Sequence, residues 1–158
     1  MSHLLAAAAG VPNACEPIPG MVTGGQPSVA QLTALKRAGC IALLDIRDPM
    51  EDQPFDPRAA ALAAGLEYIN IPVSGATQTD TTLERVRLTV RQLAGVKPFL
   101  FYCRSGNRVG ATLIPHLILD RGYDEDRAVT EAMRIGTRSP ELIEWALDYV
   151  QRQAEARP

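Results

Sequence analysis

Apolar and polar residues follow two different patterns along the chain. From residue 26 onward, three stretches place apolar residues on one face at helical spacing, and each opens on a capping residue and closes on a glycine. These stretches are 28–39, 56–65 and 81–95. Between them lie shorter runs, rich in β-branched and aromatic residues, at 40–47, 66–73 and 98–103. Strands that alternate with helices predict a mostly parallel sheet with helices on both faces.

The start signals of the three helices differ in kind. Ser28 and Gln31 form the capping-box pattern, and Thr81 stands in the same relation to Glu84. Asp56 caps a helix whose first residue is a proline. We therefore expect helices that begin directly after residues 28, 56 and 81.

The last third of the chain has a helical pattern throughout. The expected helices are 108–122, 124–136 and 139–153. Pro115 falls inside the first of them and should bend it, because an interior proline removes a backbone hydrogen bond. The run 20–25 is compatible with one more short strand at an edge of the sheet. The prediction is one α/β domain over residues 20–155, with a mostly parallel sheet of four to five strands, preceded by an N-terminal arm over residues 1–19.

Composition agrees with one ordinary domain and excludes several classes of function. The chain has 158 residues, of which 46% are hydrophobic and 22% charged, so it can bury a core without a metal or a disulfide. Its net charge of -2 offers no basic surface for nucleic acid. No apolar run reaches the length of a membrane span. The apolar start at residues 4–11 follows no Lys or Arg, so we expect a helix or an arm there and not a signal peptide.

Three cysteines stand far apart, with no pair at metal-binding spacing. An odd number of scattered thiols favours a reducing compartment, so we expect a cytoplasmic protein without a metal or another cofactor. Cys40 opens an apolar strand and should be buried. Cys15 lies in the proline-rich arm and is either an incidental thiol or a resolving thiol that the arm carries over the site.

Cys103 stands where the strand 98–103 ends and a polar turn, Arg-Ser-Gly-Asn-Arg, begins. Ligands of open α/β sheets bind beyond the carboxyl ends of the strands. The next helix begins near Arg108, so its free amides and its dipole should favour the thiolate of Cys103. Gly106 allows a positive φ that turns successive N–H groups inward, and Arg108 carries a planar fork of donors for an oxyanion. A buried structural cysteine is the alternative, but so polar a turn favours a nucleophile.

The remaining residues of this turn are candidate substrate contacts. They are Arg104, Ser105, Asn107 and Val109. Arg104 either recruits anions at the mouth of the site or is an ordinary solvated arginine.

Two resemblances bear on fold and chemistry. "YCRSGNR" resembles the active-site loop of the rhodanese sulfurtransferases, in which a Cys opens a six-residue loop that an Arg closes, and "LLDIRDPME" is similar to their strand with Asp and Arg. Four segments resemble, in order and spacing, the bacterial tyrosine-phosphatase-like domains that include the β-lactamase-hydrolase-like phosphatase group. The segments are "GMVTGGQPSVAQLTALKRAGCIALLDIR", "GLEYINIPV", "CRSGNRVGATL" and "GYDEDRAVTEA". This resemblance covers most of residues 20–135 and implies a cysteine-phosphatase-like fold.

The turn departs from the phosphatase signature, in which five residues separate the Cys from the Arg. Here Arg108 comes one position early, and a smaller ring of amides suits a persulfide sulfur better than a phosphate. A phosphatase also needs a general acid, which sulfur transfer does not. We therefore put first a rhodanese-type sulfurtransferase that moves sulfur from thiosulfate or a persulfide through Cys103 to a thiol acceptor. The alternatives are a phosphomonoester hydrolase with a Cys103 phosphocysteine and a non-catalytic module that binds phosphate or another oxyanion.

Five residues outside the turn are possible contributors to the site. Asp80 is either a general acid or a helix cap, and capping is favoured. Asp45 and Arg47 share a strand face, and we expect a buried ion pair or a contact to the turn ahead of a catalytic role. Gly25 and Gln26 either line the cleft, as the phosphatase-like resemblance implies, or form a tight turn before a proline. The sequence leaves the oligomeric state open.

Overall fold

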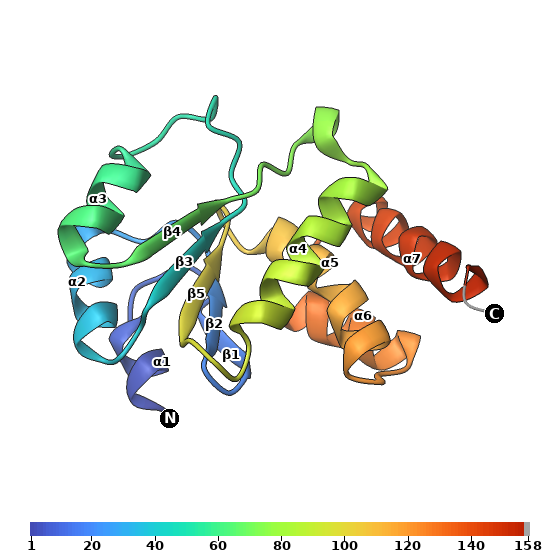
Figure 1. Ribbon diagram of the computed structural model, residues 1–158, viewed down its shortest axis with the longest axis horizontal. Coiled ribbons are helices and arrows are strands. Elements are labelled where there is room, and N and C mark those ends of the chain that lie inside the picture. Colours follow the sequence, from blue (N-terminus) through green and yellow to red (C-terminus); the bar gives the residue numbers. More distant parts are fainter. Residues whose placement is uncertain (157–158) are drawn as a thin grey trace.

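The computed structural model describes residues 1–156 as a five-stranded sheet with helices on both faces (Figure 1). The strands lie in the order β1-β2-β5-β3-β4; β1 and β2 are antiparallel, and the other neighbouring pairs are parallel. Their bounds are Cys15–Ile18 for β1, Met21–Gly24 for β2, Ala42–Asp45 for β3, Glu67–Asn70 for β4 and Phe99–Tyr102 for β5. The predicted α/β fold with a mostly parallel sheet is confirmed.

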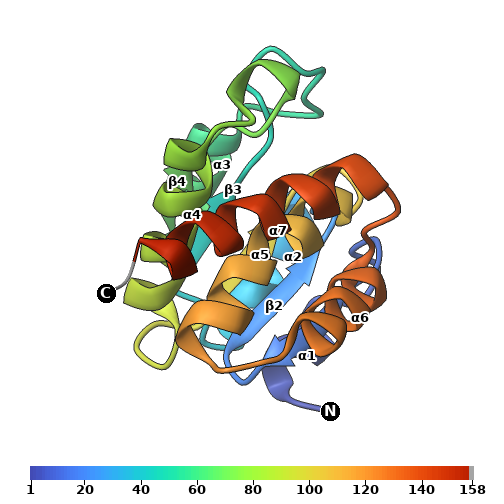
Figure 2. The same ribbon diagram turned by 90° about the vertical axis from the view of Figure 1, so that its right-hand side faces the viewer.

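The helices divide between the two faces of the sheet (Figure 1). One face carries α1 (His3–Ala7), α2 (Val29–Arg37) and α3 (Pro57–Ala64). The other carries α4 (Asp80–Leu93), α5 (Asn107–Pro115), α6 (Glu125–Ile135) and α7 (Pro140–Glu155). The central strand β5 serves an apolar core on each face, because successive side chains of a strand point to opposite sides. Figure 2 shows α6 and α7 as the outermost layer, over α5.

The helix starts follow the predicted caps at two of three places. Ser28 and Gln31 form a complete capping box, and the Asp56 carboxylate accepts hydrogen bonds from the first turn of α3. The third start was misplaced. Thr79 has the extended backbone of a cap and accepts from the Thr82 N–H, so α4 begins at Asp80 and not after residue 81.

The first nineteen residues are part of the folded unit and not a separate arm. Leu4 of α1, Ala8 and Val11 are buried in the same core as the apolar face of α2, and β1 forms one edge strand of the sheet. The run 20–25, which we expected at an edge, is therefore interior as β2. Pro17 lies within β1 and weakens its strand pattern, but a proline is tolerated in an edge strand because one side of that strand has no partner.

Pro115 marks a change in helix type. The α-helix α5 ends at Pro115, and a π-helical turn, η2 (His116–Asp120), continues from it. His116 is buried and its Nδ1 lies 3.0 Å from Asp120 Oδ2, which makes it a packed histidine far along the helix from the polar turn. Among residues 1–156, no helix combines the length and the apolar character needed to cross a membrane.

Candidate active site

Cys103 lies between the end of β5 and the first turn of α5. The residue is 1% exposed, and its Sγ accepts a hydrogen bond from the Gly106 N–H at 3.1 Å. Gly106 has a φ of 98°, which a glycine adopts without strain, and Asn107 begins the helix. The turn is therefore closed around the sulfur, and the positive end of the α5 dipole faces it.

Arg108 stands beside this sulfur with one edge of its guanidinium occupied and one edge open. Nη1 and Nη2 donate to the two carboxylate oxygens of Glu51 at 2.6 and 2.9 Å, and Nη1 also donates to the Val73 carbonyl at 3.0 Å. A guanidinium has five N–H groups, so the Nε–H and one Nη2–H bind no oxygen atom of residues 1–156, and the Cys103 sulfur is their neighbour within the site. These two hydrogens form a fork that suits two oxygens of one oxyanion.

The pKa of Arg108 reports this environment. Burial alone would lower it, but the hydrogen bonds to Glu51 and the charges of Cys103 and Glu51 raise it above its usual value. Arg108 therefore stays charged next to Cys103, and its position is fixed by Glu51 before any ligand binds.

Glu51, which the sequence did not single out, holds the catalytic arginine candidate in place. Besides the two bonds from Arg108, it accepts from the Asp48 N–H at 2.7 Å and from Arg47 Nε at 3.3 Å. The hydrogen bond from Arg108 is the main reason that the pKa of Glu51 falls to about 2. The only sequence signal was its place at the end of "LLDIRDPME", six residues after β3 ends.

Asp45 and Arg47 do not form the ion pair that we expected. The Asp45 carboxylate accepts from the Arg47 backbone N–H at 2.8 Å and from the Tyr68 hydroxyl at 2.6 Å. The Arg47 guanidinium instead donates to Gln26 Oε1 and Glu51. In a continuous strand the side chains of Asp45 and Arg47 would lie on the same face. The strand ends at Asp45, however, and the Arg47 guanidinium binds the Glu51 carboxylate instead.

Gly25 and Gln26 lie behind the turn and do not line the cleft in front of it. A Cβ on Gly25 would collide with the carbonyl oxygen of Arg104, and the Gln26 N–H donates to that same oxygen at 3.0 Å. The glycine is therefore required for close packing of β2 against the turn. Asn13 adds a third support, because its Nδ2 donates to the Ser105 carbonyl at 2.7 Å.

A hollow of about 410 Å³ opens in front of the turn. Arg104, Asn107 and Arg108 line it from the turn, with Glu51 and the start of η1 (Gly75–Thr77) on one side and the first turn of α7 on the other. Val109 has no exposed surface and packs in the core, so its side chain is not a substrate contact. The sequence missed the α7 residues, among them the exposed Glu141, because they follow the turn by more than thirty positions.

Asn107 ties the turn to α7. Its Oδ1 accepts from the backbone N–H groups of Arg138 and Ser139 at 2.8 and 3.3 Å, and its Nδ2 donates to Ser139 Oγ at 3.0 Å. Thr137 Oγ1 donates to the Asn107 carbonyl at 2.8 Å. The Asn107 side chain therefore positions the turn relative to α7, and both its oxygen and its nitrogen already have hydrogen-bond partners within the protein.

Asp80 does not line the hollow. Both of its carboxylate oxygens accept from Arg152 of α7, at 2.6 and 2.9 Å, and these bonds lower the pKa of Asp80. Cys15 also has a partner away from the hollow, because it lies in β1 with its sulfur 3.1 Å from Thr23 Oγ1. Cys40 is buried as expected, and burial raises the pKa of its thiol to about 11.

Comparison with known proteins identifies relatives of this fold and sequence. A family model described as "Beta-lactamase hydrolase-like protein, phosphatase-like domain" matches residues 18–114. The chain is 30% identical over 93 residues to a beta-lactamase hydrolase-like protein of Agrobacterium fabrum, a match that covers 56% of this chain and 21% of the relative. With the Xylella fastidiosa protein of the same name it shares 25% over 141 residues, or 77% of this chain and 32% of the relative. The chain thus spans a third or less of these relatives.

Solved structures show the same fold at low identity. A DUF442 protein from Shewanella putrefaciens has a TM-score of 0.76 at 17% identity and covers 94% of this chain and 97% of its own. The catalytic domain of the PP-IP phosphatase SIW14 from S. cerevisiae has a TM-score of 0.69 at 16% identity, with 92% of each chain covered. P. aeruginosa TpbA in complex with pTyr has a TM-score of 0.65 at 18% identity and covers 90% and 88%. These findings fit the phosphatase alternative better than the sulfurtransferase that we put first.

Proposed function

The chain belongs to the family of phosphatase-like domains found in beta-lactamase hydrolase-like proteins, and from this premise we propose that it hydrolyses phosphate monoesters through a phosphocysteine on Cys103. One observation carries the proposal: Cys103 Sγ, the Gly106 N–H and the open edge of Arg108 belong to one closed turn at a helix N-terminus. Such a turn supplies a nucleophile and an oxyanion clamp together. Two structural relatives, TpbA with pTyr and the PP-IP phosphatase SIW14, add support from their substrates.

The reaction has two steps. The Cys103 thiolate attacks phosphorus, an S–P bond forms, and the P–O bond to the leaving alcohol breaks. Water then attacks phosphorus, the S–P bond breaks, and inorganic phosphate leaves while the thiolate is regenerated. In both steps the free fork of Arg108 and the turn amides hold the equatorial oxygens.

The leaving alcohol needs a proton, and Glu141 is our candidate donor. Among the residues that line the hollow, the carboxylates belong to Glu51 and Glu141. Glu51 is held ionised by Arg108, whereas Glu141 lies exposed in the first turn of α7 without an ion-pair partner in the described chain. Asp80 is bound by Arg152 and is the poorer candidate.

Hydrolysis of p-nitrophenyl phosphate tests the proposed reaction. Wild type should release p-nitrophenol, and rapid acid quench should trap one phosphate per chain on Cys103. Cys103→Ser should abolish turnover, and Arg108→Lys should lower it by about 10² to 10³ because the fork is lost. Phosphate binding without turnover by the wild type would contradict the proposal in favour of the oxyanion-binding module.

The role of Glu141 is tested by leaving-group dependence. p-Nitrophenolate is a weak base that leaves without protonation, so Glu141→Gln should hydrolyse p-nitrophenyl phosphate like the wild type but lose about 10²-fold or more with an alkyl or phenyl phosphate. Asp80→Asn serves as the matched control and should hydrolyse both substrates normally. Equal losses of Glu141→Gln on both substrates would exclude this role.

One observation favours a second candidate, the sulfurtransferase. The turn has only four residues between Cys103 and Arg108, and within residues 1–156 one backbone N–H, that of Gly106, donates to the sulfur. In that reaction the thiolate attacks the outer sulfur of thiosulfate, the S–S bond breaks and sulfite leaves; an acceptor thiolate then takes the outer sulfur. Intact mass after thiosulfate treatment tests it: a gain of one sulfur, removed by cyanide and absent in Cys103→Ser, would favour sulfur transfer over hydrolysis.

A further inference from the structure

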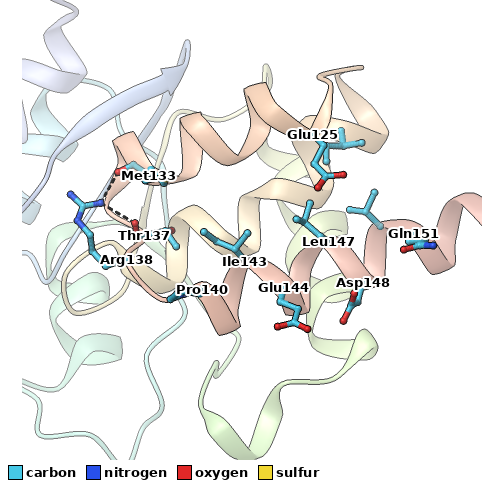
Figure 3. Close-up of a pocket in the computed structure, with 12 residues that line it drawn as sticks. Glu125, Met133, Thr137, Arg138, Pro140, Ile143, Glu144, Leu147, Asp148 and Gln151 are labelled. Carbon is cyan, nitrogen blue, oxygen red and sulfur yellow. Dashed lines mark hydrogen bonds between the residues drawn. The ribbon is translucent and has the colours of Figure 1, made fainter.

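A second cavity lies away from Cys103, between α6 and α7. It is an open groove of about 750 Å³ (Figure 3). Ile143 and Leu147 of α7 project between the two helices, and Met133 faces them from α6. Met133 is 51% exposed, although it is a large apolar side chain. Ile143, Leu147 and Val150 of α7 pack against the core of this face but are only partly buried.

Two parallel stripes run along α7 in this groove. Ile143, Leu147 and Val150 form an apolar stripe at spacings of four and three residues. The neighbouring positions are Glu144, Asp148 and Gln151, which form a polar stripe with the same spacings. A helix bound in such a groove would pack its apolar side chains against the apolar stripe. The side chains next to them on the bound helix would then contact the polar stripe.

The charged residues that line the groove indicate which kind of segment can bind there. Glu125, Glu144 and Asp148 line the groove, and none of them has an ion-pair partner within the described chain. The lining has one cation, Arg138, whose guanidinium donates to the Met133 and Thr137 carbonyls (Figure 3). The groove is therefore acidic, and it repels nucleic acid and anionic lipid while it attracts Lys and Arg.

We propose that this groove binds a helical segment of a partner protein, with an apolar stripe flanked by Lys or Arg. The lined part of α7 runs from Pro140 to Gln151, so a helix of about three turns, roughly 17 Å long, would fill it. The groove ends at Arg138, whose backbone N–H binds Asn107 of the active-site turn. The bound segment thus lies next to the hollow of Cys103, whichever reaction Cys103 performs.

Two labelled peptides test the proposal on the full chain. Both are 14-residue helical peptides with the same leucine stripe; one carries lysines beside it and the other glutamates. Fluorescence anisotropy should show the lysine peptide binding at least about tenfold tighter, as three rim carboxylates allow, and losing this advantage at high salt. Equal binding of the two peptides, or no binding of either, would overturn the proposal.

Variants locate the binding. Asp148→Lys should weaken the lysine peptide by about fivefold or more and strengthen the glutamate peptide, which a loss of folding cannot do. Glu84→Lys, an equal charge change on the exposed surface of α4, should alter neither. Leu147→Asp should abolish binding of both. If light scattering shows a dimer that Leu147→Asp dissociates, a second copy occupies the groove, and the proposal of a separate partner is wrong.

Discussion

At the scale of single residues, the site depends on how Arg108 divides its hydrogen bonds. Glu51 takes one donor from each terminal nitrogen, and the remaining edge is left for a ligand. A carboxylate in this position orients the guanidinium and keeps both groups ionised. Without Glu51, the arginine would gain rotamers that the oxyanion must then order, at a cost in binding.

The depressed pKa of Glu51 gives a pH-dependent stability. The pKa of Glu51 is about 2 in the folded chain, against an ordinary value of 4.5 that applies when the chain is unfolded. The Glu51–Arg108 pair therefore stabilises the fold fully above pH 4.5 and loses its contribution as the pH falls toward 2. The free energy of unfolding of wild type should therefore exceed that of Glu51→Gln most above pH 5, and the difference should shrink in acid. Urea denaturation at several pH values measures this.

The matched control is Glu84→Gln, at an exposed glutamate of α4 without an ion-pair partner in the described chain. Its difference from wild type should stay small at every pH. If the difference for Glu51→Gln were as flat as that of the control, the Arg108 pair would not stabilise the folded state.

At the scale of elements, the short turn is held by its neighbours more than by itself. β2 packs against it through Gly25, and the link between α6 and α7 closes over it through Asn107 and Thr137. Gly136 and Gly106 also approach each other closely, so the two chain segments share one packed contact. The geometry around Cys103 is thus a property of three elements together.

Loss of the Asn107 side chain should misplace the turn without unfolding the protein. Asn107→Ala should lower kcat for p-nitrophenyl phosphate by about tenfold to 10²-fold, because small displacements of reacting groups are costly. Ser139→Ala removes a single hydrogen bond of the same clamp and should have a smaller effect. An unchanged kcat with a lowered Tm would mean that Asn107 serves stability alone.

At the scale of the whole molecule, the two apolar cores are joined through β5. Phe99 and Phe101 belong to one core, and Leu100 and Tyr102 to the other. Because β5 contributes side chains to both cores, its loss from the packing of one core also disrupts the other. We therefore expect the two faces of the sheet to unfold together.

Trp145, the single tryptophan, reports on this coupling from α7. Leu35→Ala removes a fully buried side chain from the opposite face and should lower the free energy of unfolding by about 2–5 kcal/mol. The fluorescence transition of Trp145 and the circular dichroism transition should shift by the same amount. A fluorescence transition that stays in place would show that the faces unfold separately.

The sequence by itself determined the alternation of strands and helices, most of the helix caps and the turn around Cys103. These features depend on residues within about six positions of one another, so local periodicity and capping chemistry are enough to predict them. The conformation of Gly106 and the start of α5 are of this kind.

Only the tertiary structure decided which distant residues complete the site. Glu51 and Glu141 reach the hollow from 57 positions before and 33 positions after Arg108, and no local pattern links either of them to Arg108. The inclusion of β1 and the pairing of Arg47 with Glu51 in place of Asp45 were likewise settled by packing across the sheet edge and by the turn after β3. Side-chain pairing across such separations depends on the closed fold, and single-sequence patterns do not contain it.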